Sequence, residues 1–149
     1  MKTIAVAGAS VSNRILSEVA YEVGHMAASK GYIVLTGGLA GVMEHTLHGA
    51  KDAGGLTIGI IPSYDKSTAN PYCDVVIPTG LGHGRNILVA SSGDLCVSVG
   101  GELGTASEIA IAKKLGRKVI SFEPPFEHDT GFRDREQFFA KLCEMLEQL

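Results

Sequence analysis

Short apolar segments alternate with amphipathic segments along most of the chain. The apolar segments are rich in β-branched residues, which is typical of strands buried on both faces of a parallel sheet. Six of them predict strands, at residues 3–8, 32–37, 56–61, 75–78, 95–99 and 119–122. Apolar positions at helical spacing predict five helices between and after them, at about residues 15–26, 42–53, 85–92, 106–115 and 134–149.

This alternation predicts an α/β fold with right-handed crossovers. The expected architecture is a doubly wound, mostly parallel sheet of about six to seven strands flanked by helices. Two polar, proline-containing segments, 62–72 and 123–132, predict loops, and neither is long enough to link two domains. We therefore expect one domain over residues 1–149, a length that suits a single core.

Composition and charge exclude several classes of protein. The chain is 45% hydrophobic and 19% charged, as in an ordinary globular domain, and its net charge is -3. No basic cluster predicts binding to nucleic acid or to a membrane surface, and no apolar run is long enough to span a bilayer. Cys73, Cys96 and Cys143 are far apart and odd in number, which favours reduced thiols and a cytoplasmic location.

Glycines gather where the predicted strands end. Gly8 ends the first strand, Gly37 and Gly38 follow the second, and Gly100 and Gly101 follow the fifth. In doubly wound sheets ligands bind at this edge, glycine lets backbone N–H groups approach a ligand, and a helix that begins there adds free N–H groups. One such glycine is more often structural, but several at one edge predict an anion site, with phosphate as the expected anion.

Two common phosphate-binding motifs are absent. The dinucleotide fingerprint G-x-G-x-x-G should follow the first strand, which instead continues AGASVSNR with Gly8 alone. The acid expected after the second strand is also missing, since that position reads Leu35-Thr36-Gly37. No P-loop pattern occurs. These absences disfavour a simple NAD enzyme and a P-loop nucleotide hydrolase.

Three ordered motifs resemble those of a known superfamily. The segment TGGLAGVME (36–44) resembles the G-G-x-x-G-[LVM]-M signature of the Rossmann-like proteins often called lysine decarboxylase-like, and GGELGTASE (100–108) resembles their second signature, G-G-x-G-T-x-x-E. Between them, GLGHGRN (80–86) resembles the arginine segment that opens their central helix. This superfamily includes the Lonely Guy (LOG) phosphoribohydrolases and the molybdenum cofactor carrier proteins, and the chain is most similar to the carrier-like branch.

The resemblance implies a site for a phosphorylated ligand. Arg85 and Glu108 match the family's catalytic pair. The ligand-binding positions expected beside them are Gly8, Ser10, Gly37, Gly38, Gly41, Val42, Met43, Asn86, Gly100, Gly101, Gly104 and Thr105. No metal site and no required cofactor are expected; a nucleotide or the molybdenum cofactor is the expected ligand.

Two classes of function follow, and the sequence leaves both open. A carrier would hold the ligand without turnover, and overall similarity favours this class. A hydrolase would cleave the N-glycosidic bond of a nucleoside 5′-monophosphate. In that reaction a carboxylate stabilises the positive charge that develops on the ribose, or orients the attacking water, and a guanidinium holds the phosphate. An oligomeric scaffold with a vestigial site is a third, simpler alternative.

One residue departs from the family pattern. Glu102 and Leu103 stand where a small residue is expected before Gly104. A carboxylate close to a phosphate is repulsive, by about 1 kcal/mol in water. Either Glu102 points to solvent, or the phosphate lies elsewhere, or the ligand carries positive charge, or Glu102 is a second acid.

The remaining candidates carry weaker signals. His45 and His48 stand three residues apart on a helix, but no third metal ligand is identifiable, so a solvated helix face is favoured. His83 precedes Arg85 and is a candidate ligand contact. Ser10 and Arg14 are expected at the ligand edge, beside ordinary helix-capping residues. The helix 106–115 is apolar on more than one side, which predicts a homo-oligomer, either a dimer or a tetramer.

Overall fold

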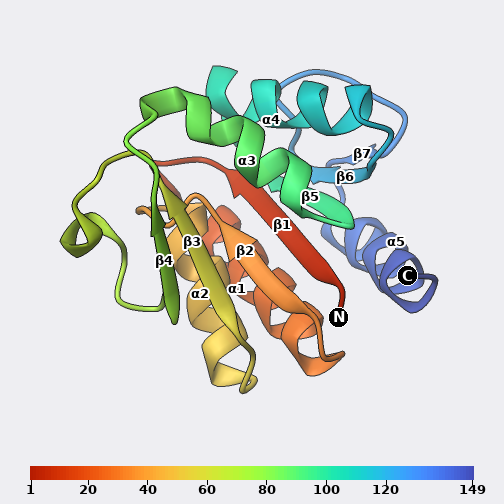
Figure 1. Ribbon diagram of the computed structural model, residues 1–149. Coiled ribbons are helices and arrows are strands. Elements are labelled where there is room, and N and C mark those ends of the chain that lie inside the picture. The colour runs from red at the N-terminus through yellow and green to blue at the C-terminus, as the bar shows by residue number, and fades with distance from the viewer.

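The computed structural model describes residues 1–149 and shows one sheet of seven strands between two layers of helices (Figure 1). The strand order is β4-β3-β2-β1-β5-β6-β7, and every neighbouring pair is parallel. The strands are β1 Thr3–Gly8, β2 Ile33–Thr36, β3 Thr57–Ile61, β4 Val75–Pro78, β5 Leu95–Val99, β6 Lys118–Phe122 and β7 Gly131–Phe132. The predicted doubly wound α/β fold is confirmed.

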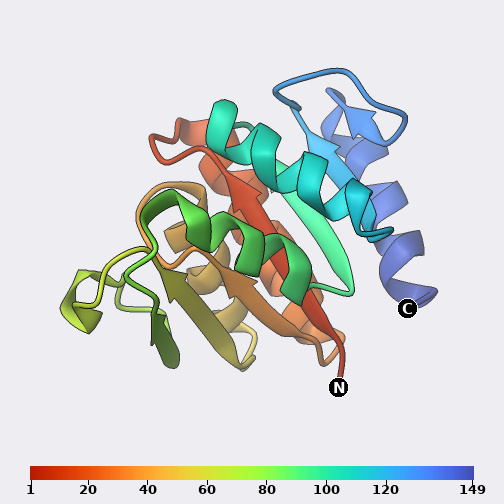
Figure 2. The same cartoon turned by 45° about the horizontal axis from the view of Figure 1, so that its top comes forward.

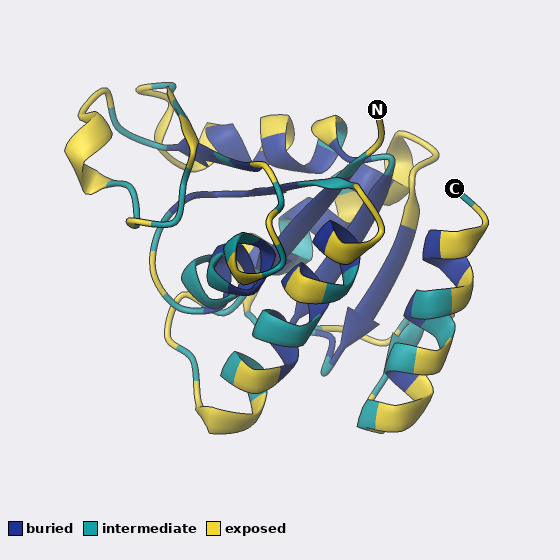
Figure 3. Cartoon of the chain, turned by 90° about the horizontal axis from the view of Figure 1, so that it is seen from below, coloured by how far each residue is buried: buried dark blue, intermediate teal, exposed yellow.

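Five helices cover the two faces of the sheet. In Figures 1 and 2, α3 (Arg85–Ser92) and α4 (Leu103–Lys114) cross the near face, and α1 (Arg14–Ser29), α2 (Val42–Asp52) and α5 (Arg135–Glu147) lie behind the sheet. Two short 3-10 turns, η1 (Lys66–Thr68) and η2 (Gly82–Gly84), lie in the connections. The larger part of the core packs between the sheet and α1, α2 and α5. Figure 3 shows that the central strands are buried and the outer faces of the helices are exposed.

Two glycines set the distance between α1 and α2. A Cβ atom at Gly24 would lie 1.9 Å from the carbonyl oxygen of Thr46, and one at Gly49 would lie 2.0 Å from that of Tyr21. The two helix backbones are therefore in direct contact, which only glycine permits at these positions. This contact fixes α1 and α2 behind β1 and β2, the strands whose ends carry the predicted site.

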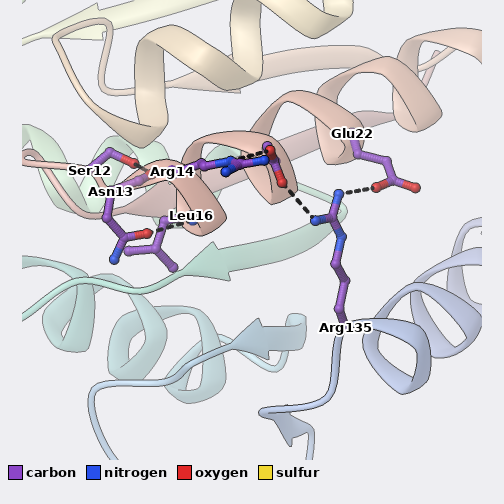
Figure 4. Close-up of polar contacts among 7 residues, drawn as sticks. Ser12, Asn13, Arg14, Leu16, Glu22 and Arg135 are labelled. Carbon is purple, nitrogen blue, oxygen red and sulfur yellow. Dashed lines mark hydrogen bonds and ion pairs between the residues drawn. The ribbon is translucent and has the colours of Figure 1, made fainter.

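Arg135 joins α5 to α1 through two carboxylates. Its Nη1 atom lies 3.1 Å from Oε2 of Glu18, and its Nη2 atom lies 3.1 Å from Oε2 of Glu22 (Figure 4). At the start of α1, the Asn13 side chain accepts a hydrogen bond of 2.9 Å from the Leu16 amide, which is the expected helix cap. These contacts orient the helices, while buried apolar side chains such as Phe138 supply the packing.

The structure corrects three local predictions. Helix α4 begins at Leu103 rather than at 106, so Gly104 lies in its first turn, where the low helix propensity of glycine hid it. β7 lies within the predicted loop 123–132, because a strand of two residues has no periodicity to detect. β4 is not buried on both faces: it is the edge strand, and Val75 and Ile77 are about 40% exposed.

Two global features bear on the remaining expectations. No helix has both the length and the hydropathy needed to cross a bilayer. The three cysteines are free, with Cys96 buried in the core and Cys73 and Cys143 half-buried.

Candidate functional site

A cavity of about 790 Å³ opens where the strand order reverses. β1 pairs with β2 on one side and with β5 on the other, so the carboxyl ends of β1 and β5 border a crevice of the kind that binds ligands in α/β sheets. Ten of the fourteen predicted site residues line this cavity: Gly8, Ser10, Gly37, Met43, Arg85, Asn86, Gly101, Gly104, Thr105 and Glu108. Three segments separated in sequence therefore meet around one space.

The other four predicted residues do not line the cavity. They are Gly38, Gly41, Val42 and Gly100. Three of their amides are already occupied: Gly38 donates to Oγ1 of Thr36 (3.0 Å), Val42 to the carbonyl of Ala9 (2.9 Å) and Gly100 to the carbonyl of Phe122 (2.9 Å). Gly38, Gly41 and Gly100 have positive φ angles of 75°, 72° and 60°. They shape the turns of the cavity wall.

The first turn of α4 faces the cavity with free amides. Its first backbone hydrogen bond runs from the amide of Ala106 to the carbonyl of Glu102 (2.8 Å), so the amides of Leu103, Gly104 and Thr105 have no helical acceptor. The hydroxyl of Thr105 has no hydrogen-bond partner within the chain, although the residue is only 4% exposed. A helix N-terminus with free donors is a favourable place for an anion.

Gly101 is required by the backbone that precedes this turn. Its φ angle is 99°, in the region that disfavours side chains, and a Cβ atom there would lie 2.1 Å from Oγ1 of Thr105. Glu102 follows as the residue that caps α4, and its side chain makes no capping hydrogen bond. It is exposed at the rim of the cavity. The sequence left four alternatives for Glu102, and its exposed position fits the first of them, a side chain that points to solvent.

Arg85 is buried in the cavity wall at the start of α3, with 8% of its surface exposed. Its Nη1 atom donates to Oδ1 of Asn86, and its Nη2 atom lies 3.5 Å from the carbonyl oxygen of Gly37 and 3.9 Å from Sδ of Met43. Its Nε atom is buried without any hydrogen-bond partner. A buried, unpaired donor is costly, and an acceptor on a ligand would remove that cost.

Glu108 lies on α4, three residues after Thr105, and is 7% exposed. It forms no ion pair with Arg85 within 4.0 Å and no hydrogen bond within the chain. Burial raises the pKa of Glu108 from 4.5 to about 7, although the positive charge of Arg85 opposes this shift. Burial likewise lowers the pKa of Arg85, and the negative charge of Glu108 opposes it. A carboxyl group with a near-neutral pKa in a cavity can exchange a proton at physiological pH.

Asn86 connects the arginine to the first turn of α4. Its Oδ1 atom accepts from Arg85, and its Nδ2 atom lies 3.4 Å from Oγ of Ser107. The hydroxyl of Ser107 in turn donates to the carbonyl of Gly104 (2.6 Å). The guanidinium and the first turn of α4 are therefore held by one chain of contacts, and Ser107 was not among the predicted site residues.

The cavity also has apolar walls that the sequence did not indicate. Val11, Leu16, Leu39, Pro62 and Leu103 line it, and none of them belongs to a motif or carries a charge. His83 lines it as well, as expected for a ligand contact. Arg14 does not line the cavity: it begins α1, and its side chain is 90% exposed and pairs with Glu18.

His45 and His48 lie on the opposite face of the molecule from α3, beside α1. The ring of His48 stacks on Tyr72 with 4.4 Å between centroids, and its Nε2 atom is 3.5 Å from Oδ2 of Asp52. No group of three or more His, Cys, Asp or Glu side chains is arranged to hold a metal ion. Aromatic and polar contacts with neighbouring side chains account for the position of His48.

The parallel sheet, the cavity at its reversal point and the free amides of α4 define a Rossmann-like protein with a candidate ligand site. More narrowly, the chain belongs to the SLOG cluster4 family, whose sequence model matches residues 1–146. This confirms the superfamily and the branch that the three motifs indicate.

Known proteins similar to this chain include carriers of a cofactor. An uncharacterised protein of Archaeoglobus fulgidus is 45% identical over 122 residues, which cover 82% of this chain and 80% of the relative. The molybdenum cofactor binding protein of Rippkaea orientalis is 37% identical, with a TM-score of 0.80, over 96% of this chain and 85% of that one. The molybdenum cofactor carrier protein of Chlamydomonas reinhardtii is 36% identical, with a TM-score of 0.78, over 97% and 86%.

Proposed function

We propose that this chain binds a phosphorylated small molecule, the molybdenum cofactor or a nucleotide, in the cavity at the carboxyl edge of its sheet. One observation carries the proposal: the residues whose amides are free at the start of α4 line the same cavity as Arg85, whose buried Nε atom has no partner. Both are hydrogen-bond donors without an acceptor in the chain, and a phosphate offers several acceptor oxygens. The names of the solved relatives support a carrier of this kind.

In this proposal the amides of Leu103, Gly104 and Thr105 hold the phosphate, together with the Thr105 hydroxyl. Arg85 donates from Nε to the phosphate or to the adjoining part of the ligand. Gly8 and Gly37 also line the cavity, where the ligand would pass close to the main chain.

The lining also indicates how a molybdenum cofactor would be held as cargo. None of the three cysteines lines the cavity, so the chain offers no thiolate to the metal there. We infer that the chain would grip the organic part and the phosphate of the cofactor. Such a grip leaves the metal end free for transfer, as a carrier requires.

Calorimetry with ribose 5-phosphate and AMP tests the proposal. Thr105→Val keeps the shape of the buried side chain and removes its hydroxyl, and we expect it to weaken both ligands about tenfold, as for the loss of one hydrogen bond to a charged group. Thr46→Val is the matched control, because Thr46 is equally buried and lies outside the cavity. If wild-type protein binds neither compound at millimolar concentration, nor a pterin or nucleotide retained through purification in native mass spectrometry, the proposal fails.

Glu108 favours a second candidate, a phosphoribohydrolase. A water molecule would attack C1′ of a nucleoside 5′-monophosphate, the bond from C1′ to the base nitrogen would break, and the base would leave with a proton. A carboxyl group with a pKa near 7 is suited to handling that proton. Incubation with AMP, followed by detection of adenine and ribose 5-phosphate, tests it. Release that is lost in Glu108→Gln favours the hydrolase, and tight binding without release favours the carrier.

We also propose that the chain forms a homo-oligomer. The exposed apolar side chains Ile87 and Leu88 of α3 and Leu115 at the end of α4 lie on the helices of one face. Light scattering during size-exclusion chromatography gives the mass directly. A dimer or tetramer supports the proposal, and a monomer at high micromolar concentration overturns it.

A further inference from the structure

We infer that Val11 and Leu103 form a clamp for a flat heterocyclic ring of the ligand at the mouth of the cavity. This inference rests on the proposed function, because it assigns a place to the part of the ligand that carries no phosphate. We call these two side chains the ring clamp.

The exposure of the two side chains carries the inference. Val11 is 88% exposed and Leu103 is 86% exposed, and among the large apolar residues only Met1, at the chain terminus, is more exposed. Fully exposed apolar side chains of this size are unfavourable in water and have no packing role in the fold. Both nevertheless border the same cavity. Because two highly exposed apolar side chains border the same cavity, we infer that they form a surface that a bound ligand covers.

The two residues reach the mouth from different elements. Val11 lies in the loop between β1 and α1, and Leu103 is the first residue of α4. In Figure 2 the loop after β1 and the start of α4 lie at the same edge of the sheet. Leu16 and Leu39, which are half-buried, line the same cavity. We call these four apolar side chains the apolar wall of the cavity.

The anion-binding groups are close to this wall. Leu103 directly precedes Gly104 and Thr105, whose free amides face the cavity. The ligand must accordingly present an apolar flat group and a phosphate within a short distance of each other. A heterocycle linked through a small sugar or a fused ring to one phosphate has this form, whereas an inorganic anion or a sugar phosphate fills only part of the site.

The test compares a ligand that has a ring with one that lacks it. AMP and ribose 5-phosphate share the sugar and the phosphate and differ in the base. Their dissociation constants are measured by calorimetry for the wild type, Val11→Ser and Leu103→Ser. Both positions are exposed, so the variants are expected to fold normally. Leu56→Ser is the control, since Leu56 is 45% exposed and lies at the other edge of the sheet, before β3.

The clamp predicts a selective effect. Each clamp variant should weaken AMP about tenfold, as expected when two or three buried carbon atoms are lost. Val11→Ser, at a residue that supplies no phosphate donor, should leave ribose 5-phosphate within about twofold of wild type. Equal changes for both ligands in Val11→Ser, or unchanged AMP affinity in either variant, overturn the clamp. An altered oligomeric mass with unchanged AMP affinity also overturns it, because the side chains would then contact a second copy. Wild-type protein that binds neither compound overturns the proposed function itself, and the clamp with it.

Discussion

Substitution of Gly101 by alanine should disrupt the turn that opens α4. The residue has a φ angle of 99°, and an alanine there costs about 1–3 kcal/mol in backbone strain alone. The added Cβ atom would lie 2.1 Å from Oγ1 and 2.5 Å from Cβ of Thr105, so this buried side chain must move. Such overpacking costs about 1–3 kcal/mol more. We expect Gly101→Ala to lower the free energy of unfolding by about 2–6 kcal/mol.

Gly116→Ala is the matched control for this experiment. Gly116 also has a positive φ angle, 73°, but a Cβ atom there would meet nothing within 4 Å. It should therefore show the backbone strain without the clash, about 1–3 kcal/mol, and no effect on ligand binding. Urea denaturation at pH 7 gives both free energies, and calorimetry with ribose 5-phosphate gives both affinities.

The two variants separate strain from site geometry. Gly101→Ala should lose more stability than Gly116→Ala and should bind ribose 5-phosphate at least about tenfold more weakly than wild type, because Thr105 is displaced. If the two variants were equally stable and bound ribose 5-phosphate equally well, the close packing of Gly101 against Thr105 would have no role in the site.

Three further predictions concern charge and packing. Because the folded-state pKa of Glu108 is raised from 4.5 to about 7, ionisation of this carboxyl group destabilises the fold as pH rises through this window. The free energy of unfolding of Glu108→Gln should exceed that of wild type by about 3 kcal/mol at pH 8, and the difference should vanish near pH 4. Equal stability of the two proteins at pH 8 would refute this. Burial lowers the pKa of His128, whose Nε2 atom lies 2.8 Å from Oγ of Ser121, so the contribution of the neutral ring to stability is present above pH 6.5 and is lost as pH falls through the folded pKa. The difference in the free energy of unfolding between wild type and His128→Asn, measured by urea denaturation, should narrow with acidification, and a constant difference would contradict this. Gly24→Ala should push α1 away from α2 and lower the free energy of unfolding by about 1–3 kcal/mol or more, which thermal denaturation measures. An unchanged melting temperature would show that the two helices can move apart without cost.

The layered fold could be predicted because its strands and helices follow simple periodicities. β1, β5 and the helices between them are long enough to show these patterns. β4 misled the prediction, because Val75 and Ile77 are as apolar as residues of a central strand although they lie at the sheet edge. Sequence alone does not order the strands, so it does not show which apolar strand lacks a neighbour.

The residues of the candidate site that carry charge were easier to predict from the sequence than its glycine and apolar residues. Arg85 and Glu108 carry charge within glycine-rich motifs, and the packing of α3 on α4 brings both to the cavity wall. Gly38 and Gly100 also belong to the predicted motifs, but their amides form hydrogen bonds within the chain, a difference that only the path of the backbone reveals. The apolar residues that line the cavity could not be predicted. In the sequence Leu103 looks like a leucine of the core, and only the structure shows that it is exposed beside the cavity.

The central claim is that a phosphate binds at the first turn of α4, and amide chemical shifts measured by NMR test it most directly. Titration of ¹⁵N-labelled protein with ribose 5-phosphate should shift the amides of Gly104 and Thr105 in a saturable way, while those of Gly54 and Gly116, which lie outside the cavity, stay in place. Saturable shifts confined to other parts of the chain, or no shifts at millimolar ligand, would contradict the account.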